Sequence, residues 1–188
     1  MSKSRRRHLL TFSAIAGLII ACTIGLIYIG PEQLVAYIRV QNGYLLLFFV
    51  SLFGGVSSIG GAFYVATIIS LAAAGLNPFY LALASGCGVS IGDSVYYYLG
   101  YRGSHVLPES GWLTNHIRNF GTWLSKQTRY LRGAAIYGYT AFTPLPNDAL
   151  TILMGITRQP YLLVLPAFVL GNITQTFLLA TLGDWLPF

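Results

Sequence analysis

The stretch FTPLPNDALTILMG, residues 142–155, places two prolines, an asparagine and an aspartate inside one of the most apolar regions of the chain. Pro144 and Pro146 lack the backbone N–H that a helix needs and they fix φ, so a helix breaks here. In lipid, each backbone group freed by such a break costs several kcal/mol unless it is buried in protein or lines a water-filled cavity. The stretch therefore predicts two half-helices whose broken ends meet inside the protein.

The composition predicts that lipid surrounds this chain. Of its 188 residues, 55% are hydrophobic and 9% are charged, whereas soluble domains carry about 25% charged residues. The formal net charge of +6 gathers in the N-terminal SRRRH and in a central loop, which argues against a nucleic-acid-binding face. Cys22 and Cys87 lie in apolar runs without metal-ligand spacing, so we expect both to be small buried hydrophobic residues. The chain is predicted to be an all-α integral membrane protein.

Three segments are long enough to cross a bilayer as helices. Residues Leu9–Ile29 would extend about 31 Å at about 1.5 Å per residue, which matches a hydrocarbon core of about 30 Å. SRRRH followed by an apolar run also resembles a cleaved signal peptide, but the length of the run favours an uncleaved first span. Residues 78–100 and 160–183 form the other two expected spans.

Two further apolar regions are interrupted too early to cross. In the first, GGVSSIGG separates two arms, Tyr44–Phe53 and Ala62–Ala74, that each reach only about 15–20 Å as helices. In the second, the proline break separates Ala134–Phe142 from Ala149–Ile156. Both regions predict re-entrant helical hairpins. The expected organisation is a first span with an interfacial helix (1–42) and then a membrane domain (43–188), made of hairpin 43–76, span 78–100, basic loop 101–132, hairpin 133–158 and span 160–183.

Basic residues set the expected orientation. Positive charge in the SRRRH end, in loop 101–132 and at Arg158 should face the cytoplasm. The N-terminus is then cytoplasmic, in a bacterial or archaeal plasma membrane, and the two hairpins enter from opposite sides. Within the loop, an apolar face at helical spacing predicts a helix on the membrane surface: Leu113, Ile117, Phe120 and Leu124.

A weak internal repeat relates the two hairpin-and-span units. AGLNPFYLALASG (74–86) and MGITRQPYLLVLPAFVLG (154–171) share a glycine, a proline, an aromatic residue and two leucines. The matched pairs are Pro78 with Pro160, Phe79 with Tyr161, Leu81 with Leu163 and Leu83 with Leu165. The expected orientation makes the two copies antiparallel. This organisation is typical of inverted-repeat transporters, whose broken helices meet near the bilayer midplane.

Asp148 is the first candidate for a transport pathway. Asn147 suits the N-cap of the helix DALTILMGI, and Asp148 lies in its first turn, where a negative charge is stabilised by the helix dipole. Capping alone does not explain a charge at membrane depth, which costs about 2.5–3.5 kcal/mol or more. A pathway role for Asp148 is therefore favoured over a capping role.

Asp93, in SGCGVSIGDSVYYYLG, is the second intramembrane acid. A salt bridge to Arg129 or Arg132 and a role in a transport pathway are both open interpretations. Polar residues of the last span, Asn172, Thr174 and Gln175, are expected to form helix–helix hydrogen bonds. No paired-acid, triad or metal-ligand spacing is found, and His105 and His116 are expected to be solvated. The sequence thus predicts no enzyme, no metal and no cofactor.

Four features make the sequence resemble the DedA family, the bacterial and archaeal relatives of the SNARE-associated Golgi (VTT-domain) proteins. They are the Gly-rich first hairpin ending in LAAAGLNP, the segment GDSVYYYLGYRG, the TPLPND break, and LMGITR followed by a span that contains a glycine. The resemblance covers roughly Gly43–Gly183, and the second-hairpin motif is its most specific part. It implies two opposed re-entrant hairpins and a role in moving lipids, such as undecaprenyl phosphate or phospholipids, across a bilayer.

Candidate functional residues come from the chain itself and from the resemblance. Independently of the resemblance, the two breaks and the second span supply the candidate pathway residues: Ser57, Ser58, Gly60, Gly61, Asp93, Thr143, Pro144, Pro146, Asn147 and Asp148. The resemblance implies that arginines near the second hairpin contact a lipid phosphate, namely Arg129, Arg132 and Arg158, although anchoring at the cytoplasmic surface explains them equally well. One departure is that the first hairpin tip, GGVSSIGGAF, lacks the acid and proline usual in the family. Passive scrambling therefore fits at least as well as proton coupling.

We expect a lipid transporter or scramblase that moves phospholipid or polyprenyl-phosphate-type lipids. A proton-coupled transporter of small solutes or ions, and a non-transporting membrane organiser, are the alternatives. The expected partners are membrane lipids, with protons and further copies of the chain left open, and no nucleic acid.

Overall fold

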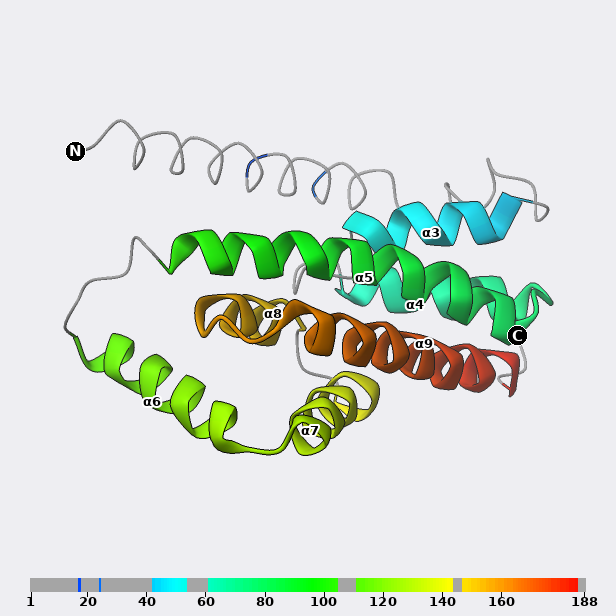
Figure 1. Ribbon diagram of the computed structural model, residues 1–188. Coiled ribbons are helices and arrows are strands. Elements are labelled where there is room, and N and C mark those ends of the chain that lie inside the picture. Colours follow the sequence, from blue (N-terminus) through cyan, green and yellow to red (C-terminus); the bar gives the residue numbers. More distant parts are fainter. Residues whose placement is uncertain are drawn as a thin grey trace.

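The computed structural model describes residues 17, 24, 42–53, 61–104, 111–143 and 147–185. This part of the chain contains seven helices and no strand, as the all-α prediction requires (Figure 1). In chain order they are α3 (Gly43–Phe53), α4 (Gly61–Ala73), α5 (Pro78–Gly103), α6 (Trp112–Lys126), α7 (Arg129–Phe142), α8 (Asn147–Ile156) and α9 (Tyr161–Trp185). The first expected span, Leu9–Ile29, and the tip of the first hairpin lie outside the described residues.

Two long helices, α5 and α9, lie side by side and run in opposite directions at the centre of the bundle (Figure 1). Helix α5 begins where Asn77 accepts a hydrogen bond from the N–H of Phe79 and Pro78 occupies the first turn. Side-chain contacts follow the antiparallel register. Near the start of α5, Ser85 meets Thr176 at 3.1 Å, and further along Asp93 meets Asn172 at 2.8 Å.

The four shorter helices pack on this central pair in a crossed pattern. The short helices form two pairs, α3–α4 and α7–α8. The first helix of each pair packs on the long helix that follows that pair in the chain, so α3 lies against α5 and α7 lies against α9. The second arm packs on the other long helix, so α4 lies against α9 and α8 lies against α5. Each helix pair therefore contacts both central helices. Helix α6 lies at the edge of this assembly, where it contacts α8 (Figure 1).

Glycines at matching positions of α5 and α9 allow this close packing. A β-carbon at Gly88 would overlap the carbonyl oxygen of Phe48 on α3, and one at Gly171 would lie 2.6 Å from Cβ of Thr140 on α7. Twelve residues after each of these glycines comes a second one, Gly100 on α5 and Gly183 on α9. Gly100 meets the backbone of Ile152 on α8, and a β-carbon at Gly183 would lie 3.0 Å from Cα of Ile69 on α4. On each central helix, one glycine thus meets the first arm of a helix pair and the other glycine meets the second arm of the other pair.

Polar side chains lie inside the bundle and many large apolar side chains lie outside. The exposed apolar residues include Leu162, which is 79% exposed, together with Leu45, Phe49, Ile91, Leu170, Phe177 and Leu182. The buried polar residues are Ser51, Thr67, Ser85, Ser90, Asp93, Thr140, Asn147, Thr151, Gln159, Asn172 and Thr176. The core also contains buried apolar side chains, such as Leu47, Ile68 and Phe168, so the unusual features are the large exposed apolar surface and the buried polar residues together.

Among the described helices, α9 is the one that is both long and apolar enough to cross a membrane, over Tyr161–Gly183. Helix α5 has 26 residues and is long enough by geometry, at about 1.5 Å per residue. It does not reach the same apolar composition, because Ser85, Ser90 and Asp93 lie on its buried side.

The helix boundaries lie close to the ends of most predicted helical segments, and the structure corrects two predictions. Both arms of the first hairpin agree within one residue. The predicted loop 101–132 is too long, because α7 already begins at Arg129, where Thr128 accepts the N–H of Leu131 at 3.3 Å and caps the helix. Cys87 is exposed rather than buried, since it shares an outward-facing apolar stripe of α5 with Leu83 and Ile91. Cys22 lies outside the described residues.

Candidate functional site

The buried polar side chains between the helices form two separate clusters. We call the first the carboxylate cluster; it lies between α5, α8 and α9 and consists of Ser90, Asp93, Asn147, Thr151 and Asn172. We call the second the hydroxyl cluster; it lies between α3, α4, α5 and α9 and consists of Ser51, Tyr64, Ser85 and Thr176. Both clusters lie on the α5–α9 contact, one beside each pair of shorter helices.

Asp93 is the centre of the carboxylate cluster. Its side chain is only 1% exposed. One carboxylate oxygen accepts a hydrogen bond from the amide of Asn172 at 2.8 Å, and the other accepts from the hydroxyl of Thr151 at 3.3 Å. Both donors are neutral, so of the two open interpretations of Asp93 the salt bridge to Arg129 or Arg132 is not formed. The bridge fails because Arg132 donates instead to Gln159 and Arg129 is exposed at the start of α7.

Asn147 connects the helix break to this carboxylate. Its amide nitrogen donates to Oδ1 of Asn172 at 3.0 Å, and Asn172 in turn donates to Asp93. The predicted capping role of Asn147 is wrong, because its Oδ1 accepts no hydrogen bond from a described residue although it is buried. A buried amide oxygen of this kind is left as an acceptor for a donor that the cluster does not supply.

Asp148 lies in the first turn of α8, as predicted. Its Oδ1 accepts the N–H of Ala149 at 2.9 Å, and the residue is half-buried. Thr151 follows three residues later, on the same face of the helix, and contacts Asp93. The start of α8 therefore brings the two acids singled out in the sequence to one region between α5 and α8.

The hydroxyl cluster contains no ionisable acid or base near neutral pH. The Tyr64 hydroxyl lies 2.8 Å from the oxygens of both Ser85 and Thr176, and Ser51 donates to Ser85 at 3.0 Å. These four residues come from four different helices. The cluster joins α3 and α4 to the two central helices through neutral hydrogen bonds.

The remaining predicted pathway residues are only partly brought together. Thr143 ends α7, and its carbonyl oxygen accepts the amide of Gln175 at 3.1 Å. Gly61 is the first residue of α4. The rest lie outside the described residues: Ser57, Ser58, Gly60, Pro144 and Pro146. The predicted helix–helix hydrogen bonds of the last span are confirmed, since Asn172 and Gln175 make the contacts above and Thr174 lies 3.3 Å from the Tyr137 hydroxyl.

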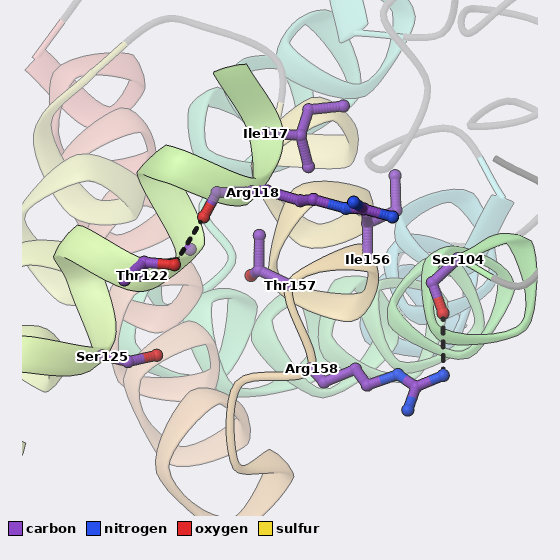
Figure 2. Close-up of a pocket in the computed structure, with 9 residues that line it drawn as sticks. Ser104, Ile117, Arg118, Thr122, Ser125, Ile156, Thr157 and Arg158 are labelled. Carbon is purple, nitrogen blue, oxygen red and sulfur yellow. Dashed lines mark hydrogen bonds between the residues drawn. The ribbon is translucent and has the colours of Figure 1, made fainter. Parts of the chain in front are cut away.

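The three predicted phosphate-binding arginines do not form one group. Arg132 donates to Oε1 of Gln159 at 3.0 Å. Arg158 follows α8 and donates to the Ser104 hydroxyl at 3.5 Å, with its guanidinium 5.4 Å from the centre of the Tyr101 ring. Arg158 shares a cavity with Arg118 of α6, which the sequence reasoning did not single out (Figure 2).

Sequence reasoning also missed Thr151 and Gln159. Gln159 is fully buried, and its amide reaches Ser125 at 3.2 Å on α6 while its backbone carbonyl accepts the Tyr97 hydroxyl. Gln159 is a single polar residue before Pro160, so no helical spacing of polar residues indicated that it would be buried. Thr151 lies one helical turn after Asn147 in an otherwise apolar run, and that spacing could have indicated a shared polar face.

No family model, curated protein or solved structure compared with the chain matches it. The resemblance to the DedA family therefore stays a prediction from the four sequence features. Within the described part of the chain, no group of three or more His, Cys, Asp or Glu side chains could hold a metal ion.

Proposed function

We propose that the chain moves phosphate-bearing lipids across a bilayer, as a transporter or scramblase. The observation that carries the proposal is Asp93, a fully buried carboxylate held by neutral donors where α5, α8 and α9 meet. Ionisable residues at such depth in a membrane protein are costly and usually mark a substrate or ion pathway. The resemblance to the DedA family gives the lipid as the expected substrate.

The membrane setting is part of this proposal. We infer a multi-pass protein of the plasma membrane with a cytoplasmic N-terminus, three spans and two re-entrant hairpins, α3–α4 and α7–α8. Its support is the apolar outer surface, the polar clusters buried between the helices and the length of α9. The short arms also support it, because 10 to 14 residues of helix reach less than about 25 Å, short of a bilayer core of about 30 Å.

An inverted repeat is the arrangement that best accounts for the crossed packing. If α3, α4 and α5 are equivalent to α7, α8 and α9, then every major helix contact has an equivalent in the other half. The spacing from Gly88 to Gly100 equals that from Gly171 to Gly183, and each glycine meets the corresponding short helix; these glycines are offset by one residue from pairs such as Pro78 and Pro160. In inverted-repeat transporters, substrate sites lie at the interface of the repeats. Here that interface contains Asp93 and Asn172.

The chemistry of the site suits a polar headgroup that crosses an apolar layer. The end of α7 and the start of α8 present backbone groups and the Asp148 carboxylate beside the carboxylate cluster. The Oδ1 of Asn147 has no partner among the described residues and can accept a hydrogen bond from a hydroxyl or ammonium group, or from water. A headgroup passing this junction would exchange its water for these groups while its acyl or prenyl chains stay in lipid.

Proton-coupled transport is the second candidate, and the two acids favour it. A carboxyl group can bind and release a proton, and Asp93 and Asp148 both lie beside the start of α8. The first hairpin needs no acid of its own if these two residues carry the proton. In this form of the proposal the substrate is a small solute or ion, and lipid movement is absent.

The test is lipid flip-flop in proteoliposomes. Vesicles with a head-labelled phospholipid are bleached from outside, using wild type, Asp93→Asn and protein-free vesicles. We expect wild type to bleach to completion and Asp93→Asn to stop near half, because the variant keeps the shape and the Asn172 contact but loses the carboxylate. Ser85→Ala, on the same helix but in the hydroxyl cluster, is the matched control and should behave as wild type.

Wild-type vesicles that stop near half would contradict the lipid proposal for the lipid tested. A pH jump across the same vesicles then separates the second candidate. Proton-driven uptake of a solute that is lost in Asp93→Asn would support it, whereas an inert wild type would leave the organiser alternative.

A further inference from the structure

The apolar stripe of α6 that was predicted to lie on the membrane is covered by protein at Phe120 and Leu124. Leu124 is only 4% exposed and belongs to a core cluster with Met154 of α8, against which Phe120 also packs. Between these two residues, a β-carbon at Gly121 would lie 2.8 Å from Cβ of Thr157, so the backbone of α6 is close to the turn after α8. This side of α6 is therefore occupied and is not free to contact lipid.

Gln159 fixes α6 in this orientation. Its buried amide donates to Oγ of Ser125 at 3.2 Å and to the carbonyl oxygen of Gly121 at 3.5 Å, both on α6. Two residues later, at Tyr161, begins the apolar helix α9 that is long enough to cross a membrane. Helix α6 thus lies at the level where this span begins (Figure 1), which is the level of lipid headgroups if α9 crosses a bilayer.

A second stripe of α6 faces away from the protein. Its members follow one another at spacings of four, three, four and three positions, which places them on one side of a helix. They are Trp112, His116, Asn119, Trp123 and Lys126. All five side chains are exposed, Trp112 to 76% and Trp123 to 57%. We call this stripe the tryptophan face.

Contacts within α6 hold the two indole rings in place although they are exposed. The His116 ring centre lies 4.3 Å from that of Trp112, and Nδ1 of His116 lies 2.8 Å from the Trp112 carbonyl oxygen, to which it donates. The Trp123 ring centre lies 6.0 Å from that of Phe120, which packs on the core. Side chains that are ordered before binding lose less conformational entropy when a partner covers them.

The chemistry of the tryptophan face suits an anionic membrane surface. Tryptophan is enriched where the headgroup layer meets the hydrocarbon core. Residues 111–132 contain four basic side chains and no acidic one, namely Arg118, Lys126, Arg129 and Arg132. Each Lys or Arg close to an anionic leaflet contributes about 1 kcal/mol to binding. Aromatic rings and positive charge on one exposed helix therefore favour anionic lipid over a neutral surface.

We propose that the tryptophan face of α6 binds the anionic headgroup layer of the membrane that α9 crosses. Trp112 and Trp123 insert their rings at the headgroup level, and Lys126 adds attraction to negatively charged lipid. The surface that contacts the membrane is then a different side of α6 from the predicted apolar stripe. This inference rests on the membrane setting proposed above, but not on lipid transport.

The test uses the full chain in nanodiscs, where both membrane faces are open to solutes. The chain has three tryptophans, so Trp112→Phe combined with Trp185→Phe leaves Trp123 as the fluorescent probe. Quenching by acrylamide, which is neutral, is compared in phosphatidylcholine alone and in a mixture with phosphatidylglycerol. We expect phosphatidylglycerol to lower the quenching constant by about twofold or more, because it draws the ring into the headgroup layer.

Two matched controls separate the tryptophan face from the rest of α6. Thr122→Trp, made together with Trp123→Phe in the same background, moves the indole by one position to an exposed site on the cavity side. This probe should be quenched equally in both lipids. Lys126→Gln should remove most of the effect of phosphatidylglycerol on Trp123, as should high salt. Arg118→Gln removes the same charge from the cavity side and should keep most of that effect.

Far-UV circular dichroism confirms that each variant is folded before it is compared. Equal quenching of Trp123 in both lipids, or equal protection of the Thr122→Trp probe, would overturn the proposal. Protection that follows the number of chains per nanodisc instead of lipid charge would also overturn it and assign the face to a second copy. If phosphatidylglycerol protects Trp123 but proteoliposomes show no flip-flop, the surface stands and the transport proposal falls. A chain that does not enter nanodiscs would contradict the membrane setting and this surface with it.

Discussion

The two buried clusters occupy comparable places and have different chemistry. Each lies on the α5–α9 contact beside one pair of short helices, and each joins side chains from at least three helices. The hydroxyl cluster is neutral, and each of its four residues has a hydrogen-bond partner within the cluster. The carboxylate cluster contains Asp93 and a buried amide oxygen, on Asn147, that has no partner among the described residues.

This difference in chemistry suggests different roles for the two clusters. A fully satisfied hydroxyl network can hold helices together without carrying charge. A buried carboxylate and an unsatisfied amide oxygen cost stability, so they are expected where a ligand or proton compensates for them. We infer that the α3–α4 side stabilises the bundle and that the α7–α8 side carries the function.

The largest expected effect is on transport, at Asp148. Asp148→Asn should abolish lipid movement in the proteoliposome assay while leaving folded protein, because it removes the half-buried charge at the start of α8 but keeps the side-chain acceptor for Ala149. Bleaching kinetics at matched protein density measure this. Full lipid movement in Asp148→Asn would contradict a role for Asp148 in transport and leave Asp93 as the acid with a proposed function.

The next largest effect is expected on protein stability, in two single variants that each remove one hydrogen-bonding side chain from one cluster. Asn172→Ala leaves a carboxylate oxygen of Asp93 and the amide of Asn147 without partners, which should lower the free energy of unfolding by about 3 kcal/mol. Thr176→Val should cost only about 1 kcal/mol, because Tyr64 and Ser85 still bond each other. Chemical unfolding in detergent, followed by far-UV circular dichroism, compares them. Equal losses in the free energy of unfolding would mean that the two clusters contribute equally to the stability of the protein.

The smallest expected effect is at Tyr64. Tyr64→Phe removes one hydroxyl and leaves Ser51, Ser85 and Thr176 bonded to one another, so we expect a loss of about 1 kcal/mol in the same unfolding experiment. Lipid movement should stay at the wild-type rate. A transport defect as large as that of Asp148→Asn would show that the hydroxyl cluster also belongs to the pathway.

Local chemistry along the chain was enough to predict the elements. Proline, glycine and the length of apolar runs predicted the arms α3, α4 and α8 within two residues, because breaks in a helix depend on residues close in sequence. The start of α7 was missed by several residues because the Thr128 cap was overlooked. The sequence singled out Asp148 in TPLPND and did not predict the cluster that Asn147 joins.

Only the tertiary structure decided which polar residues meet. Asp93, Asn147 and Asn172 are far apart in the chain, and nothing in their spacing shows that one amide links the other two. The same holds for the cavity between Arg118 and Arg158 and for the left-handed turn at Arg158. The sequence by itself determined an all-helical, strongly apolar chain with two breaks, because composition and helix breaking are local properties. Which side chains share a buried site depends on long-range packing, here on matched glycines that let α5 and α9 approach their neighbours.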